Sequence, residues 1–396
     1  MTETQASLES DLLSTAMLER FRERAPIYDQ ENRFCQEDFD ELQQCGYLKM
    51  AIPREFGGLG FNLSEVCQQT RRLATYAAPT ALCTNMHIYW TGVCSELRKQ
   101  GDHSLDWVLE LAGQGAVLAA GHGEKGNDLP VLLSTTSAQP VDGGYVVNGH
   151  KSFGSLTPVW DWIGIHAQDN SDPDNPMIVH AFVPRDAEGV SIKETWDVMG
   201  MRATGSDDTL LQDVFVPAKH IARVVPGGFA GADLFVLSIF ACALIPFGVI
   251  YQAIARRCLE LVTGMLEGKP SIGLSRDMRH HAEVQHGIAE MVLDLETIQP
   301  YLDRIAHDWS QGVDHGALWA LKIVGAKYHA VETAWRVVDR AMELSGGWGM
   351  FRKTELERQF RDARAGRFHP ANSALTHEIA AKTVLGLDLD EQPRWG

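Results

Sequence analysis

The sequence predicts an α+β fold with three parts, in the order helical, β, helical. Residues 1–113 carry apolar side chains three to four positions apart, which is the spacing of amphipathic helices. Residues 114–222 instead contain short apolar or alternating runs between turn dipeptides, and residues 223–396 return to long helical spacing. We therefore expect an N-terminal all-helical domain, a middle antiparallel β domain and a C-terminal four-helix bundle.

The N-terminal domain is expected to form helices over residues 8–48, 63–98 and 105–111. Ser64 is the expected N-cap of the second of these, because a hydroxyl followed by an acidic residue is typical of a helix start. A glycine-rich loop over residues 54–62 precedes this helix.

The middle domain is expected to be a sheet of short strands. Gly143-Gly144, Asn148-Gly149 and Asp172-Pro173 are turn dipeptides between them. The last strand, over residues 210–217, alternates apolar and polar residues and is closed by Pro217. The strands expected before it cover residues 116–120, 138–141, 144–147, 162–167 and 178–183.

The C-terminal domain contains the longest helical patterns. Its most apolar run, residues 234–250, includes Pro246 and Gly248 and, at about 17 residues, is at the short limit for a membrane span. We therefore expect a buried helix and no membrane association. The helices expected in this domain cover residues 234–265, 278–312, 315–344, 355–361 and 373–387.

Composition argues against several classes of partner. The net charge of -17 disfavours nucleic acid and anionic membrane surfaces. The seven cysteines form no C-x-x-C pair, and neither H-x-x-x-H nor paired-carboxylate spacing occurs, so we expect reduced thiols and no metal site. The polar N-terminus has no signal-peptide pattern, and together with the thiols it favours a cytoplasmic protein.

Residues 199–206 read MGMRATGS, a turn-rich loop, and the strand after it ends D-V-F-V-P. This stretch resembles the signature of the acyl-CoA dehydrogenase superfamily, a G-M-R-x-T-x-S loop leading into a strand that ends D-V-x-V-P. The resemblance implies a flavoenzyme of helical, β, helical architecture that forms a homotetramer or dimer. Further segments resemble that family's motifs in the same order: F-G-G-x-G at 56–60, N-G-x-K at 148–151, G-G-x-G at 346–349 and R-D-A at 361–363.

The resemblance also implies which residues hold the flavin, expected to be FAD. Arg202, Thr204 and Ser206 would lie beside it. Phe153 would pack on the ring, and Ser155 would hydrogen-bond near the ring atom N5. The other residues expected at the cofactor are Gly123, Glu343, Gly346, Gly347 and Asn372, with Gly346 and Gly347 approaching the dinucleotide of a neighbouring subunit.

A substrate pocket is expected against the first helix of the bundle. Phe240 and Phe247 lie in its apolar run, which suggests a hydrophobic or aromatic substrate group. Asn127 stands where the family has a serine that contacts pyrophosphate or substrate, so we expect it in the same pocket. A CoA thioester is one candidate for the substrate.

The family's catalytic glutamate is missing. One of its two usual positions is Pro370, and the other is near Ser238, where no carboxylate lies between Asp233 and Glu260. His369 lies next to the first position. An R-D pair followed by a histidine at this spacing resembles the superfamily's oxygen-using monooxygenase branch, in which a histidine and a serine near N5 help to form and protonate a flavin peroxide. His369 and Ser155 are therefore the expected catalytic residues.

Three functions stay open at this point. The first is an oxygenase or monooxygenase acting on an aromatic or acyl-CoA substrate, with FAD either tightly held or supplied as reduced flavin by a reductase. The second is an acyl-CoA dehydrogenase with a relocated base, for which Glu378 is a candidate, and with an electron-transfer protein as partner. The third is a non-catalytic subunit. His122 and Glu124 are further titratable groups near the site, for which structural roles are at least as reasonable.

Overall fold

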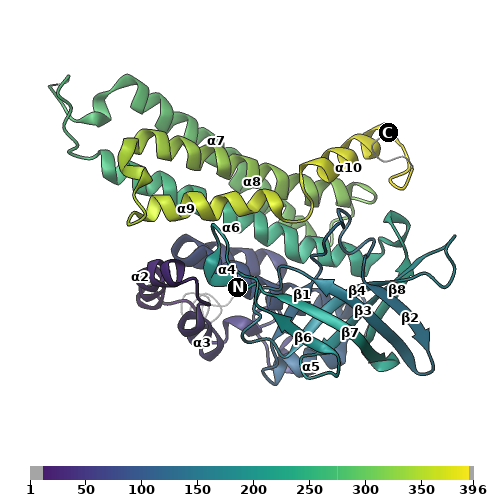
Figure 1. Cartoon of the computed structure of the whole chain (residues 1–396). Coiled ribbons are helices and arrows are strands. Elements are labelled where there is room, and N and C mark those ends of the chain that lie inside the picture. Colours follow the sequence, from purple (N-terminus) through teal and green to yellow (C-terminus); the bar gives the residue numbers. More distant parts are fainter. Residues whose placement is uncertain (1–11, 274, 392–396) are drawn as a thin grey trace.

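The computed structural model describes residues 12–273 and 275–391 and has the expected helical, β, helical order (Figure 1). The N-terminal helices are α2 (Thr15–Glu31), α3 (Gln36–Gln44), α4 (Leu63–Lys99) and α5 (Asp106–Gly113). The N-cap of α4 is Asn62 rather than Ser64. Its side chain accepts from the Glu65 backbone N–H, while the Glu65 carboxylate accepts from the Asn62 N–H, which satisfies two free donors at once.

The middle domain is one sheet in the order β6-β7-β3-β2-β4-β5-β8, with β1 paired to β4. Most pairs are antiparallel, as predicted, whereas β1 runs parallel to β4. Strands β6 and β8 were not predicted from the sequence, and β8 continues past residue 222 to Pro226. The strands are β1 (Leu118–Gly121), β2 (Ser137–Val141), β3 (Gly144–Lys151), β4 (Trp162–Asp169), β5 (Met177–Pro184), β6 (Val190–Lys193), β7 (Asp208–Pro217) and β8 (Ile221–Pro226).

The C-terminal helices are α6 (Leu234–Leu266), α7 (Ala282–Ser310), α8 (Leu318–Ser345), α9 (Glu355–Arg364) and α10 (Ser373–Leu385). Figure 1 shows α7, α8 and α9 running alongside one another, with α6 between them and the N-terminal helices. Among the described residues, α6 is the helix long and apolar enough to cross a membrane. Its most apolar window is 83% buried inside the protein, as in a core helix.

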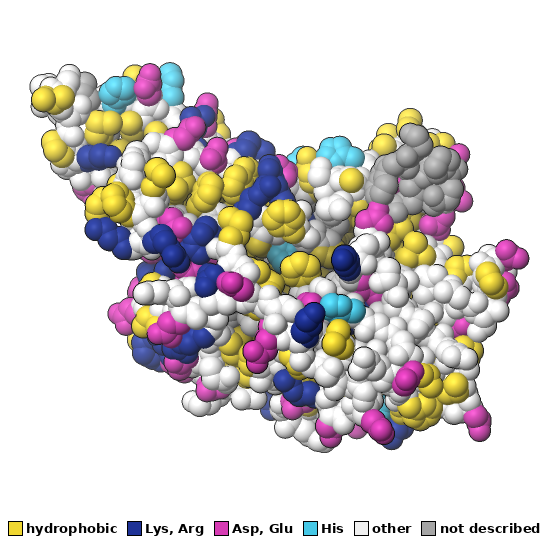
Figure 2. Space-filling model, viewed as in Figure 1, with side chains coloured by type: hydrophobic (Ala, Val, Ile, Leu, Met, Phe, Trp, Pro, Cys, Tyr) yellow, Lys and Arg dark blue, Asp and Glu magenta, His cyan; other side chains and the backbone are white. Residues whose placement is uncertain are grey.

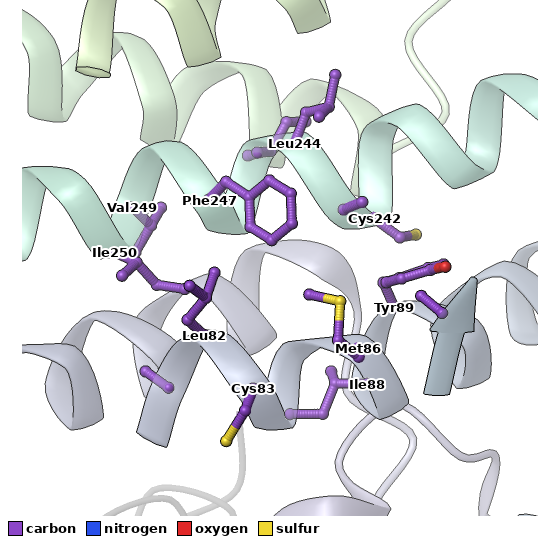
Figure 3. Packing of buried hydrophobic residues seen from close by; sticks show 14 of the residues in the cluster. Leu82, Cys83, Met86, Ile88, Tyr89, Cys242, Leu244, Phe247, Val249 and Ile250 are labelled. Atoms are coloured by element: carbon purple, nitrogen blue, oxygen red, sulfur yellow. The ribbon is translucent and has the colours of Figure 1, made fainter. Parts of the chain in front are cut away.

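Helices α4 and α6 form the seam between the first and last domains. Figure 3 shows Leu82, Met86 and Tyr89 of α4 facing Cys242 and Phe247 of α6 across it. All five side chains are less than a tenth exposed. Burial of this apolar area holds the helical domains together beside the sheet, and it brings Phe247 towards the domain junction.

Candidate functional site

The signature loop docks directly on helix α9. A Cβ atom at Gly200 would lie 2.2 Å from the backbone oxygen of Arg361, so only glycine fits there. The next residue, Met201, donates its backbone N–H to Asp362 Oδ1 at 2.5 Å. Burial raises the pKa of Asp362 to about 6. The glycine and the carboxylate together fix the loop of the middle domain to the helical bundle.

We expect Gly200→Ala to break this docking. The added methyl group must push the loop away from α9, which should lower stability by about 1–3 kcal/mol and weaken flavin binding. Gly264→Ala is the matched control, because nothing lies within 4 Å of a Cβ at that helical position. Chemical denaturation measures the stability of both variants, and flavin titration measures their affinity for the cofactor. Wild-type values for Gly200→Ala would contradict it.

Arg202 anchors the same loop on its other side. Its guanidinium donates to the carbonyl of Asp29 in α2 at 2.7 Å and to the carbonyl of Val198 at 2.5 Å. Arg361 of α9 in turn forms a bidentate ion pair with the Asp29 carboxylate, with N–O distances of 2.8 and 2.6 Å. In the described contacts Arg202 therefore holds the loop to α2, and its flavin contact stays a prediction.

The side chains of Ser155, Thr204 and Ser206 lie in one hydrogen-bonded group, and their contact with a flavin stays a prediction. Thr204 Oγ1 donates to the Met201 carbonyl at 2.9 Å and lies 2.7 Å from Ser206 Oγ. Ser206 Oγ lies 2.8 Å from Ser155 Oγ. The result is a continuous chain of buried hydroxyls that ends at Ser155.

An exposed aromatic ring, that of Phe153, lies two residues before Ser155. Phe153 is 65% exposed although it is a large aromatic residue, and its φ of 59° is in the left-handed region that such residues rarely adopt. At Gly123 a Cβ would lie 2.4 Å from the Ser152 carbonyl oxygen, so glycine is required where these two backbones pair. An exposed ring, a side-chain-free backbone and a terminal hydroxyl fit a planar cofactor with polar edges.

The residue after Gly123, Glu124, accepts an unusual number of hydrogen bonds. Lys151 Nζ donates to it at 2.5 Å, Thr136 Oγ1 at 2.6 Å and Ser134 Oγ at 2.7 Å. The side chains of Lys151 and Glu124 are both fully buried. Burial alone would raise the pKa of Glu124, but His166 and Lys151 beside it hold the pKa well below its usual value.

The partners of Glu124 titrate abnormally as well. Burial lowers the pKa of Lys151 to about 8, against the opposing effect of Glu124. Burial and Lys151 lower the pKa of His166 to about 4. Asn127, expected in the substrate pocket, donates to Glu124 at 2.8 Å and to the Leu133 carbonyl at 2.7 Å. The structure thus places Asn127 within the scaffold that holds this loop.

His369 follows the short turn after α9, and its ring lies between two aromatic residues of α6. It stacks on Phe247 with ring centroids 4.7 Å apart, and its Nε2 atom is 2.7 Å from the Tyr251 hydroxyl. Lys327 of α8 is buried and donates to the carbonyls of His369 and Ala371, at 3.0 Å each. Burial and the charge of Lys327 lower the pKa of His369 to about 3, so the imidazole is neutral at physiological pH.

The Tyr251 hydroxyl assigns the ring proton of His369. Burial raises the pKa of this phenol far above neutrality, so it keeps its proton. Among the described residues its acceptor is His369 Nε2, so the imidazole proton is placed on Nδ1. Tyr251 and Lys327 were not predicted from the sequence. Tyr251 stands one helical turn after Phe247, and that spacing was the available signal.

The other predicted cofactor and substrate residues make contacts that do not involve Ser155 or His369 in the described part of the chain. Asn372 caps α10 by accepting from the Leu375 N–H at 3.0 Å. Glu343 is exposed and pairs with Arg340 at 2.7 Å, and Gly346 and Gly347 are exposed after α8. Phe240 is half-buried on α6. Among the described contacts, none joins Glu343 or the two glycines to Ser155 or His369.

Glu378, the candidate for a relocated base, lies on α10. Its carboxylate is 6% exposed and forms an ion pair with Lys382 Nζ at 2.9 Å.

Comparison with known protein families identifies the fold. Models of the acyl-CoA dehydrogenase N-terminal, middle and C-terminal domains match residues 3–103, 118–214 and 248–374. The chain belongs to the acyl-CoA dehydrogenase superfamily. Its predicted architecture is thereby confirmed, and it is a flavin-dependent enzyme of that superfamily.

Members of the superfamily with different activities resemble this chain. "Putative acyl-CoA dehydrogenase YdbM" of Bacillus subtilis is 28% identical, over 92% of this chain and 93% of its own length. Indole-3-acetate monooxygenase of Pseudomonas putida is 24% identical, over 96% and 95%. The crystal structure of KijD3 with FMN and an amino-keto-sugar nucleotide superimposes with a TM-score of 0.85 at 23% identity, over 100% of this chain and 97% of the other.

Proposed function

We propose that this superfamily member is an oxygenase-type flavoenzyme that uses reduced FAD and O₂ to oxidise an aromatic or acyl-CoA substrate. The observation that carries the proposal is the neutral His369 beside Pro370, where the dehydrogenases have a carboxylate. With a pKa of about 3, this imidazole is too weak a base to remove a proton next to a thioester, but it can donate a hydrogen bond.

The flavin supplies the electron transfer and the reaction with oxygen. Ser155 would hold the ring near N5, and the exposed face of Phe153 would pack on it. His369, its proton placed on Nδ1 by Tyr251, would supply a hydrogen-bond donor on this side of the site. Phe247, which is 6% exposed, keeps water from that side of the imidazole. Asn127, Phe240 and Phe247 are the proposed substrate side of the site.

Assembly of several copies is part of the proposal. Large apolar side chains are exposed on the bundle near Gly346 and Gly347, and Figure 2 shows hydrophobic side chains interspersed with Lys and Arg over the bundle. An apolar face of this kind fits a contact between subunits. It would let Glu343, Gly346 and Gly347 reach the dinucleotide of a neighbouring FAD. The exposed apolar residues are Trp348, Met350, Phe351 and Phe368.

The oxygen reaction tests this function. The protein is loaded with FAD, reduced without air, and mixed with O₂ in a stopped-flow spectrometer. We expect a transient species whose absorbance spectrum lies between the spectra of reduced and oxidised flavin. The lifetime of this species should change when substrate is present. Direct reoxidation, together with bleaching of oxidised FAD by an acyl-CoA, would support the dehydrogenase instead. Failure to bind flavin would support a non-catalytic subunit.

A further inference from the structure

We propose that the hydroxyl chain of Thr204, Ser206 and Ser155 makes the site select the reduced flavin, which carries a proton on N5, over the oxidised flavin. This inference rests on the proposed function, in which Ser155 faces N5. It goes further, because it assigns Thr204 and Ser206 a positioning role that acts through Ser155. Its basis is the direction of each hydrogen bond in the chain.

The direction follows from counting protons. Each hydroxyl has one proton to donate. When Thr204 donates its proton to the Met201 carbonyl at 2.9 Å, the serine is the donor in the 2.7 Å contact with Ser206. Ser206 has then used its proton, so in the 2.8 Å contact with Ser155 the donor is Ser155.

In this direction of the hydrogen bonds, Ser155 is left with acceptor lone pairs only. Reduced flavin has an N–H at N5 that can donate to such an oxygen, and every bond of the chain is kept. Oxidised flavin has a bare nitrogen at N5, and two acceptors facing each other do not bind. An unpaired buried acceptor is costly, so this direction of the chain disfavours the oxidised ring.

The hydrogen bonds among the three hydroxyls can also run in the opposite direction, but with one hydrogen bond fewer. Thr204 would donate to Ser206, Ser206 to Ser155, and Ser155 to the bare N5. The Met201 carbonyl would then keep the Thr204 backbone N–H at 3.1 Å and lose the threonine hydroxyl. Oxidised flavin thus binds at the expense of one buried hydrogen bond, which is roughly a fivefold to tenfold loss of affinity.

The test compares two dissociation constants for the full chain. Apo-protein is titrated without air with oxidised FAD and with dithionite-reduced FAD. We expect the reduced form to bind about fivefold to tenfold more tightly. In Thr204→Val the proton of Ser206 has no acceptor at position 204, so Ser206 donates to Ser155 and Ser155 donates to N5. The preference for reduced over oxidised FAD should then fall to a ratio of about one or below. Ser206→Ala should lower the ratio in the same way, because Ser155 then loses its acceptor.

Two controls separate hydrogen-bond direction from packing. Thr204→Ser keeps the hydroxyl and should restore the wild-type ratio. Thr209→Val makes the same isosteric change at a buried hydroxyl that has no partner among the described residues, and it should leave the ratio unchanged. The ratio can also be read from the midpoint potential of bound FAD, where tenfold corresponds to about 30 mV for two electrons.

The outcomes distinguish this inference from the proposed function. Tighter binding of oxidised FAD by the wild type, or an unchanged ratio in both Thr204→Val and Ser206→Ala, overturns the inference while leaving a flavoenzyme. Binding of neither form overturns the proposed function and this inference together. A ratio that falls in both variants and returns in Thr204→Ser supports the assignment even if the oxygen reaction shows no intermediate.

Discussion

A His369→Ala variant is expected to lose product formation by roughly 10²- to 10⁴-fold, the usual contribution of a positioned proton donor. Flavin content should stay near that of the wild type, because the hydroxyl chain and the loop proposed to hold the ring do not include His369. The measurement is turnover per bound flavin, with flavin quantified after denaturation. His377→Ala removes an exposed histidine on α10 and is the matched control.

The pH dependence sharpens this result. Because burial and Lys327 lower the pKa of His369 to about 3, the imidazole stays neutral through the range in which an ordinary histidine titrates. The ratio of wild-type to variant rates should therefore be the same at about pH 6 and about pH 8. Equal turnover of His369→Ala and wild type would remove this residue from the mechanism. A rate loss that appears only above about pH 7 would point to an ordinary histidine base.

The second large effect is expected on stability, from Glu124→Ala. This change leaves the fully buried ammonium of Lys151 without its carboxylate, and breaking a buried pair from one side typically costs about 3–5 kcal/mol. Hydroxyl and backbone donors from residues 134–136 lose their acceptor in the same step. Urea unfolding of the apo-protein measures the change.

A double variant distinguishes the buried charge from simple loss of packing. Glu124→Leu combined with Lys151→Met removes both charges and keeps side-chain volume, so it should recover a large part of the stability lost by Glu124→Ala. Asp186→Ala, at an exposed position in a turn, is the control for removal of a surface carboxylate. A loss below about 1 kcal/mol in Glu124→Ala would show that Lys151 finds another partner or loses its proton.

Much of the secondary structure was predictable because it depends on neighbours in the chain. The spacing of apolar residues identified α6 to within one residue, and turn dipeptides separated the strands β2 and β3. Residues Val190–Lys193 of β6 were missed because that strand is short and has no buried face of its own. The N-cap of α4 was placed two residues too late, at Ser64, because Asn and Ser both cap helices and only the backbone geometry shows that Asn62 does so here.

The candidate site likewise has features that local sequence predicts and features that depend on the tertiary structure. The sequence by itself determined the family, the loop with Thr204 and Ser206, and the absence of a carboxylate at position 370, because each is a local pattern of residue types. The tertiary structure decided what those residues touch. Tyr251 and His369 are 118 positions apart, Lys151 and Glu124 are 27 apart, and Ser155 and Ser206 are 51 apart. Hydrogen-bond direction and pKa depend on atoms a few ångströms away in space, and no pattern along the chain specifies those atoms.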